Sequence, residues 1–282
     1  MPENAIQLWE LSTNAGEKKV DLPDMSTLDA ITRQLPTGYY STFRTFDGGK
    51  RVLGLQAHLR RLYEPAAVQN IMVSVDADEL RKYLSDVLNN AYSGEARVRV
   101  IMTQEGQVYV AIEALVPLPT EVYSQGVNVI TTEVQREKPR LKSTAFITAS
   151  NNKRTEISRS NIFDALLMRN GYILEGMTSN FFYIKNGVLG TARKNILLGV
   201  TRRTVLRVAR GIGLDIEYRS LKREQVSVLS EAFLTSSSRG IVPIVQIDNV
   251  LVGERHPGPE TKKLINGYQV YVMKHVELIY RK

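Results

Sequence analysis

ALLMRNGYILEGMTSNFFYIKNGVLG, residues 165–190, carries the clearest fold signal in the sequence. It holds two pairs of apolar segments, and an Asn-Gly dipeptide joins each pair, at Asn170-Gly171 and at Asn186-Gly187. Asn-Gly between segments rich in β-branched and aromatic residues favours the tight turns of β-hairpins. We therefore predict two consecutive hairpins here.

The segments around these hairpins alternate between strands and helices. VNVITTEVQ from residue 127 reads as a strand, and KSTAFITASNNKRTEISRSN from 142 as one polar helix. After the hairpins come a basic amphipathic helix beyond Gly199, the strand EAFLT, the loop SSSRG and the strand IVPIVQI. A last helix is expected from about Pro259 to Arg281.

The first half of the chain repeats this mixture. A short helix is expected behind Ser26 as N-cap, then a hairpin turned at Asp47-Gly48-Gly49, two helices and a hairpin over residues 96–115. Strands outnumber any local βαβ pattern, so an α+β fold with mixed sheets is favoured over a doubly wound sheet.

A proline-containing linker is expected to divide the chain into two domains. With 282 residues, two domains are expected. VPLPTEVYSQG, which contains Pro117, Pro119 and Gly126, is the best linker candidate. We predict a small N-terminal domain over residues 1–119 and a larger C-terminal domain over residues 120–282.

Composition removes several classes of chemistry. The chain has no Cys, which excludes disulfides, thiolate metal sites and cysteine nucleophiles, and its three His lie far apart, so no metal centre is expected. The net charge of +8 is dispersed without a nucleic-acid-reading motif. No membrane span and no signal peptide are expected, and we predict a cytoplasmic protein.

Four separated segments carry candidate chemistry. Glu175 lies between an apolar strand and a polar turn, and a buried carboxylate there needs a cationic partner, whereas at a sheet edge it needs none. Thr201 opens a helix whose free N–H groups suit an anion, although it is equally an ordinary N-cap. The serine loop at Ser236 and Ser237 either binds a phosphate or is an ordinary polar loop. Arg61 in HLRRLY either binds an anion or lies with its aliphatic stem over a buried helix.

Taken together and in order, these segments resemble the class IV aminotransferases, the fold-type IV pyridoxal phosphate enzymes. The resemblance covers the chain from about Gly38 to the C-terminal helix. Its marks are GYYSTFRTFDGG followed by HLRRL, a lysine ahead of a polar helix, LEGMTSNFF followed by IKNGVLGTA, ILLGVTR, and EAFLTSSSRGIVPI with the later GPET. It implies a small N-terminal α/β domain and a larger C-terminal mixed-sheet pseudo-barrel. It also implies a homodimer, because members of the family pair in this way.

The resemblance implies pyridoxal 5′-phosphate as cofactor. Arg61 matches the arginine that holds its phosphate, and a guanidinium suits a phosphate bidentately. The remaining matches to phosphate- and ring-binding positions are Leu198, Val200, Thr201, Ser236 and Ser237.

The resemblance also implies the residues on either side of the ring. Glu175 matches the carboxylate that faces the pyridine nitrogen and keeps it protonated, with Ser179 and Asn180 in the supporting turn. Lys142 matches the Schiff-base lysine, which must be nucleophilic and later moves the Cα proton. The family's Asn-Tyr-Leu after this lysine is absent here, and Lys138 and Lys153 are the competing positions.

Substrate selection is expected from Tyr40 and Arg99, which match substrate-pocket positions. Arg99 either captures a substrate carboxylate or, like Arg97, pairs with an acidic neighbour. Gln104-Glu105-Gly106 replaces the arginine-glycine pair of the D-amino acid enzymes, which argues against D-specificity.

The leading function is therefore a transferase, passing an amino group between a hydrophobic or branched-chain amino acid and 2-oxoglutarate by a ping-pong mechanism. The alternatives are an aminodeoxychorismate lyase or a D-amino acid aminotransferase of the same family and, outside it, a non-catalytic phosphate- or nucleic-acid-binding protein.

Overall fold

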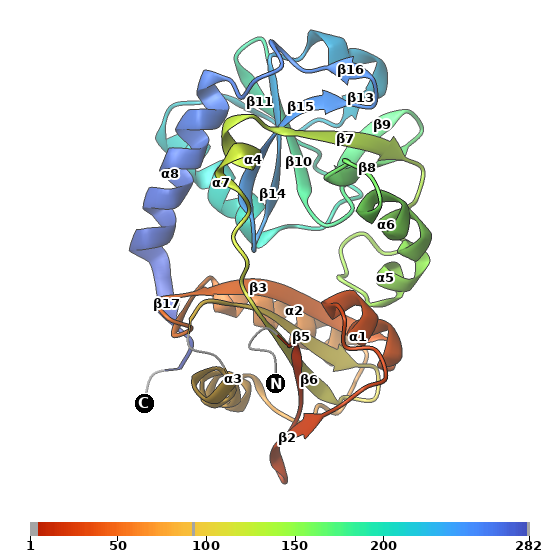
Figure 1. The fold of residues 1–282 in the computed structure, drawn as a ribbon, viewed down its shortest axis with the longest axis vertical. Coiled ribbons are helices and arrows are strands. Elements are labelled where there is room, and N and C mark those ends of the chain that lie inside the picture. The colour runs from red at the N-terminus through yellow and green to blue at the C-terminus, as the bar shows by residue number, and fades with distance from the viewer. Residues whose placement is uncertain (1–4, 92–93, 281–282) are drawn as a thin grey trace. The chain divides into compact units, whose positions relative to one another are not determined.

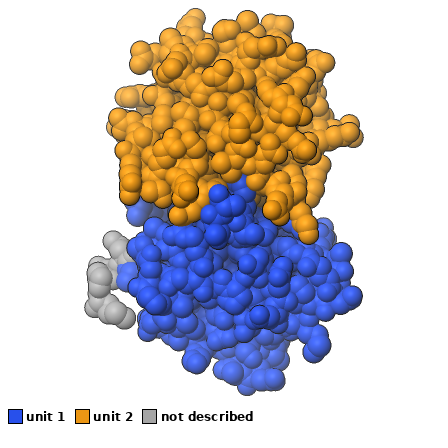
Figure 2. All heavy atoms as spheres, turned by 90° about the vertical axis from the view of Figure 1, so that its right-hand side faces the viewer, with its two compact units in different colours: residues 1–116, 141–149, 275–282 blue, residues 117–140, 150–274 orange. Residues whose placement is uncertain are grey.

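The computed structural model describes residues 5–91 and 94–280. Its chain divides into two compact units (Figure 2). Unit 1 contains residues 1–116, 141–149 and 275–282, and unit 2 contains residues 117–140 and 150–274. The predicted division at 119/120 places residues 141–149 and 275–282 with the C-terminal domain, whereas the structure places both segments in unit 1.

Unit 1 is built on a seven-stranded sheet with the strand order β17-β4-β3-β5-β6-β1-β2 (Figure 1). All its strand pairs are antiparallel. The predicted hairpins β3–β4 and β5–β6 are confirmed. The elements are β1 (Gln7–Ser12), β2 (Gly16–Val20), α1 (Leu28–Gln34), β3 (Gly38–Phe46), β4 (Arg51–Leu53), α2 (Leu55–Val68), α3 (Ala77–Ala91), β5 (Ala96–Thr103), β6 (Val108–Ala114), α5 (Ala145–Ala149) and β17 (Val276–Leu278).

Two local expectations for unit 1 need changing. The N-cap of α1 is Thr27, whose Oγ1 accepts a hydrogen bond from Ala30 N at 2.9 Å, and not Ser26. The pair β1–β2 is not expected from the sequence, and β1 also pairs with β6 along its length.

Residues 141–149 join unit 1 because they pair with the start of β3. Tyr40 N donates to Lys142 O at 2.9 Å, and Gly38 N donates to Thr144 Oγ1 at 2.8 Å. A Cβ at Gly38 would lie 2.0 Å from Met102 O, so only glycine fits between β5 and this segment. The sheet therefore fixes the backbone of Lys142.

The C-terminal segment joins unit 1 in the same way. The predicted single helix to Arg281 is wrong, because the helix ends at His275 and β17 then pairs with β4; Arg281 itself lies outside the described residues. Glu277 Oε1 also accepts a hydrogen bond from Leu55 N at 2.8 Å, the first residue of α2. The partner of this last strand lies more than two hundred residues away in sequence, where local periodicity gives no signal.

Unit 2 is a ten-stranded mixed sheet with the order β12-β11-β10-β14-β15-β7-β8-β9-β13, in which an additional pairing of β9 with β10 closes a barrel (Figure 1). The pairs β15–β7, β7–β8 and β11–β12 are parallel. Its elements are α4 (Thr120–Ser124), β7 (Val127–Thr132), α6 (Asn151–Ser158), β8 (Asp164–Arg169), β9 (Tyr172–Gly176), β10 (Asn180–Lys185), β11 (Val188–Gly190), α7 (Val200–Gly211), β12 (Ile216–Glu217), β13 (Leu221–Lys222), the 3₁₀ helix η1 (Arg223–Val228), β14 (Glu231–Ser236), β15 (Gly240–Ile247), β16 (Val250–Leu251) and α8 (Pro259–His275).

The two Asn-Gly hairpins, β8–β9 and β10–β11, are confirmed. Asn170 and Asn186 have φ of 52° and 50°, the left-handed values that Asn and Gly tolerate best. The predicted polar helix from 142 is wrong as one element, because it is interrupted at Ser150 into α5 and α6. Among the described residues, no helix is long and apolar enough to cross a membrane.

Candidate active site

The barrel of unit 2 closes at Glu175. The backbone pairing of β9 with β10 is between Glu175 and Asn180. The Asn180 side chain strengthens this pair, because its Nδ2 donates to Glu175 Oε2 at 3.1 Å. Glu175 is only 2% exposed, and a carboxylate buried this deeply is stable only with charged or hydrogen-bonding partners.

The cationic partner of Glu175 is Arg136. Its Nε lies 3.0 Å from Glu175 Oε1, its Nη2 donates to Met177 O at 2.9 Å, and its side chain is 5% exposed. The expectation that a buried Glu175 has a cationic partner is confirmed, but sequence reasoning did not identify the cation. The available signal is weak: Arg136 stands in the charged run REKPR between the strand β7 and Lys142.

The loop before α7 brings its backbone to the same carboxylate. Leu197 N donates to Glu175 Oε2 at 3.0 Å, and Asn180 Nδ2 also donates to Leu197 O at 2.8 Å. A Cβ at Gly199 would lie 2.1 Å from Asn180 Oδ1, so the approach of this loop requires glycine. Leu197 is therefore tied to Glu175, whereas the predicted ring contact Leu198 is 48% exposed.

At the N-terminus of α7, the Thr201 hydroxyl lies next to the serine loop. Thr201 Oγ1 lies 3.5 Å from Ser237 Oγ, so the structure brings together these two predicted phosphate-binding residues. Val200 and Thr201 are buried in the first turn of the helix. Free N–H groups and the helix dipole at this end favour an anion.

Ser179 and Ser236 belong to a neighbouring hydrogen-bond network around Asp164. Ser179 Oγ donates to Asp164 Oδ2 at 2.8 Å, and Thr178 Oγ1 donates to the same oxygen at 3.0 Å. Arg239 then links the network to the serine loop, donating to Thr178 Oγ1 at 2.6 Å and to Ser236 Oγ at 3.1 Å. Ser179 thus braces the turn between β9 and β10, and Asp164 is a buried member that sequence reasoning missed.

In unit 1, Lys142 lies against Tyr40. Its Nζ is 4.6 Å from the centroid of the Tyr40 ring, and the Arg99 guanidinium is 4.9 Å from the same centroid. Tyr40 is 4% exposed and is held by its backbone bond to Lys142. The structure therefore brings together the predicted lysine and both predicted substrate residues.

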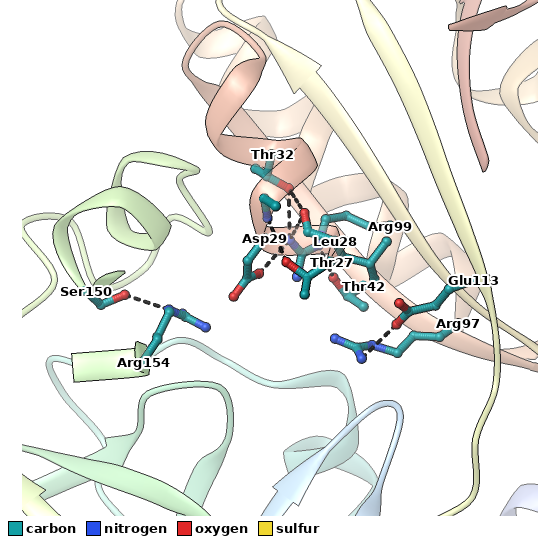
Figure 3. A network of polar contacts seen from close by, with 11 residues as sticks. Thr27, Leu28, Asp29, Thr32, Thr42, Arg97, Arg99, Glu113, Ser150 and Arg154 are labelled. Atoms are coloured by element: carbon teal, nitrogen blue, oxygen red, sulfur yellow. Dashed lines mark hydrogen bonds and ion pairs between the residues drawn. The ribbon is translucent and has the colours of Figure 1, made fainter. Parts of the chain in front are cut away.

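Arg99 donates hydrogen bonds to residues at the start of α1 (Figure 3). Its Nη1 donates to Leu28 O, Asp29 Oδ1 and Thr32 Oγ1 at 2.8–2.9 Å, and its Nε donates to Thr42 Oγ1 at 3.1 Å. Of the two alternatives left open by the sequence, the structure favours pairing with an acidic neighbour.

Arg61 lies on α2, half-buried, one turn after the buried His58. His58 Nδ1 is 2.8 Å from Ser41 Oγ, and its ring packs on Phe43 at 5.1 Å between centroids. His58 thus fixes α2 to β3. In the part of the chain that the structure describes, no cluster of His, Asp or Glu could hold a metal ion.

The motif GPET has a structural explanation. The buried Glu231 carboxylate accepts hydrogen bonds from Glu260 N at 3.0 Å and Thr261 N at 2.6 Å, and so caps the N-terminus of α8. A Cβ at Gly258 would lie 2.3 Å from the carboxyl carbon of Glu231, which explains the glycine.

Known proteins resemble this chain in sequence and in fold. The sequence model of the family described as amino-transferase class IV matches residues 38–247. A branched-chain-amino-acid aminotransferase of Pseudomonas aeruginosa is 28% identical over 253 residues, 82% of each chain. A D-alanine aminotransferase of Bacillus licheniformis is 26% identical over 260 residues, 84% of this chain and 88% of the relative.

A solved structure shares the fold. The branched-chain amino acid aminotransferase of Escherichia coli has a TM-score of 0.81 at 21% identity, and the match covers 98% of this chain and 99% of that one. The predicted mixed α+β fold with a closed C-terminal barrel is confirmed. Because the family model matches most of the chain, the protein belongs to the class IV aminotransferases, a family of enzymes that use pyridoxal 5′-phosphate.

Proposed function

We propose that the protein transfers an amino group between a hydrophobic or branched-chain amino acid and 2-oxoglutarate, using pyridoxal 5′-phosphate in a ping-pong reaction. The observation that carries the proposal is Glu175. It is a buried carboxylate bound by Arg136, by Asn180 and by the backbone of Leu197, beside a helix N-terminus with two hydroxyls.

The donors of unit 2 fit the cofactor. The hydroxyls of Thr201 and Ser237 and the free N–H groups of α7 are the groups that bind a phosphate monoester. Glu175 would accept a hydrogen bond from the protonated pyridine nitrogen, and the Arg136 guanidinium favours the ionised carboxylate that this requires. When bound, pyridoxal 5′-phosphate supplies an electron sink that stabilises negative charge at the substrate Cα.

We assign the remaining steps to residues of unit 1. Lys142 would hold the cofactor through its aldehyde carbon and, once the substrate amine displaces it, would move the proton between the substrate Cα and that carbon. Tyr40, packed on Lys142 Nζ, restricts where this amine can go. Arg61 would add a guanidinium to the phosphate. Arg99 acts by fixing Tyr40 and α1 rather than by binding substrate.

The test is spectroscopic and chemical. The purified protein should be yellow with added pyridoxal 5′-phosphate, and borohydride should fix the cofactor to Lys142, as peptide mapping would show. Lys142→Ala should lower transamination by about a thousandfold or more, while Lys138→Ala and Lys153→Ala serve as matched controls. A colourless protein, or equal activity of Lys142→Ala and the wild type, would contradict the proposal.

Two activities within the family are the second candidates. The similarity to a D-alanine aminotransferase, at nearly the same identity as to the branched-chain relative, favours D-amino acid transamination as the next choice. Assays of L- and D-leucine, L-valine and D-alanine with 2-oxoglutarate and with pyruvate, and of aminodeoxychorismate alone, separate transaminase from lyase and L- from D-specificity. A homodimer and a cytoplasmic location also remain proposals, the first supported by family resemblance and the second by the absence of cysteine.

A further inference from the structure

A cavity of about 420 Å³ in unit 2 is lined by three arginines, a leucine and a tyrosine. The lining residues are Arg140, Arg193, Leu198, Arg202 and Tyr218. This volume is in the range of small-molecule sites. Of the residues that match cofactor-binding positions, Leu198 lines the cavity, whereas Glu175, Thr201 and Ser237 do not, so the proposed phosphate-binding hydroxyls lie outside its lining.

The arginines of this cavity make no ion pair with a carboxylate of the described residues, although the charge of Glu175 acts on Arg202. Within residues 5–91 and 94–280, no ion pair joins Arg140, Arg193 or Arg202 to an acidic residue. Arg140 Nη2 donates to Arg193 O at 2.9 Å, and Arg202 Nη2 donates to Ala192 O at 2.9 Å, so both guanidinium groups are positioned by neutral oxygens. A cluster of like charges held in this way repels itself until an anion binds.

Arg202 is the most constrained of the three. It is 5% exposed, and its Nε has no hydrogen-bond partner among the described residues. Burial lowers the pKa of Arg202 and the charge of Arg140 lowers it further, while Tyr218 and Glu175 offset only part of this shift. A buried donor without a partner costs free energy that a bound anion would recover.

The other walls of the cavity are fixed and contain no acidic group. Tyr218 follows β12, and its hydroxyl accepts a hydrogen bond from Arg210 Nη2 at 2.6 Å. Leu198 follows Leu197, whose backbone is tied to Glu175 and Asn180. Arg140 and Arg193 are exposed, so an anion can reach the cavity from solvent.

From these observations we propose that unit 2 carries a second anion site, distinct from the cofactor's phosphate site, that binds a small polyanion such as a diphosphate or a polycarboxylate. Arg140 and Arg193 supply the exposed guanidinium groups, and Arg202 supplies the buried one. Guanidinium forks bind phosphate and carboxylate oxygens bidentately, which suits a ligand with two or more anionic groups.

The test is calorimetric titration of the cofactor-loaded protein with sodium pyrophosphate and, separately, with sodium citrate at constant ionic strength. We expect saturable binding of at least one of them at one site per chain, and the stronger of the two identifies the class of anion. Arg140→Gln and Arg193→Gln should each weaken binding by about tenfold. Arg169→Gln, which removes the same charge from the exposed end of β8, should leave the affinity unchanged.

Further variants separate this site from its alternatives. Thr201→Ala should leave pyrophosphate binding unchanged, whereas an equal loss in Thr201→Ala and Arg140→Gln would place the anion in the cofactor's phosphate site and overturn the proposal. The absence of binding by the wild type, or equal weakening by Arg169→Gln, would also overturn it. If Arg193→Gln changes the mass of the assembly in light scattering and no anion binds, the cavity is an interface between copies. Lys142→Ala should still bind the anion, so this result does not depend on the proposed activity.

Discussion

Each unit contains an arginine–carboxylate pair with a buried arginine, and the two pairs have similar distances in very different surroundings. In unit 1, Arg99 Nη1 lies 2.8 Å from Asp29 Oδ1, and in unit 2, Arg136 Nε lies 3.0 Å from Glu175 Oε1. The Asp29 side chain is 26% exposed, whereas Glu175 is 2% exposed. The distance between the charges therefore does not distinguish the pairs, but the solvation of the carboxylate does.

The surroundings explain what each pair does. Arg99 is surrounded by oxygens of α1 and β3, so its role is to fasten a helix to a sheet (Figure 3). Glu175 is surrounded by donors from a loop, a strand and Arg136, and it stands where the barrel closes beside the start of α7. The guanidinium and the other donors around this carboxylate stabilise its charged form, which is what a protonated ring nitrogen requires.

The largest expected difference between the pairs is in catalysis. In the proposed function, Glu175→Gln removes the charge that would face the ring nitrogen, and we expect turnover to fall by about a hundredfold or more. Asp29→Asn should change turnover little, because Asp29 only supports α1. The measurement is single-turnover transamination of both variants at saturating cofactor, with cofactor content read from absorbance. Equal losses in the two variants would remove the distinction between the pairs.

The next difference is in stability. Arg136→Met leaves Glu175 buried without its cation, which we expect to cost about 3–5 kcal/mol. Arg99→Met should cost about 1–3 kcal/mol, because water can reach Asp29. Urea unfolding midpoints of the two variants give the comparison, and the double variant Arg136→Met/Glu175→Leu should regain part of the loss. A larger cost for Arg99→Met would reverse the conclusion drawn from exposure.

A smaller effect tests how far the site around Glu175 extends. Thr201→Ala removes the hydroxyl at the start of α7, and we expect about tenfold weaker binding of pyridoxal 5′-phosphate, because hydrogen bonds to charged groups are among the stronger ones. Turnover at saturating cofactor should change much less. Thr204→Ala, one turn along the same helix, is the matched control. Unchanged cofactor affinity in Thr201→Ala would exclude this residue from the phosphate site.

The smallest effect concerns a third pair in unit 2, Asp248 and Arg223. Arg223 Nη2 lies 2.7 Å from Asp248 Oδ2, and the Arg223 side chain is 51% exposed. Burial alone would raise the pKa of Asp248, but hydrogen bonds from Thr131 and Arg223 hold it below its ordinary 3.8. A lowered folded-state pKa stabilises the protein above the unfolded-state pKa, and this contribution is lost as the pH falls through the folded value.

Asp248→Asn should therefore lower the free energy of unfolding by about 1 kcal/mol at neutral pH. The difference in the free energy of unfolding between the variant and the wild type should become smaller below about pH 4. Urea unfolding from pH 7 to pH 3 measures this difference, and a difference that stays constant down to pH 3 would contradict the assignment. Asn tolerates the φ of 52° at this position, so the backbone is not disturbed.

Local sequence could predict the hairpins and most of the helices. Asn-Gly turns and apolar periodicity act over a few residues, and both predicted hairpins of unit 2 form at Asn170 and Asn186. The motifs also located Glu175 and Asn180, which the structure brings together. Arg136 and Asp164 were missed, because a single arginine or aspartate in a polar stretch looks like any solvated charge until its surroundings are known.

The family, the mixed α+β composition and the position of the buried glutamate can be predicted from the sequence, because they depend on residue types at short spacing. The tertiary structure was needed to show that β9 pairs with β10 to close the barrel, that Arg136 is the cation at Glu175, and that Leu197 N donates to this carboxylate. It also decided that residues 141–149 pair with β3. Each of these facts depends on contacts between residues far apart in the chain, and such contacts form only when the sheets bring distant strands together.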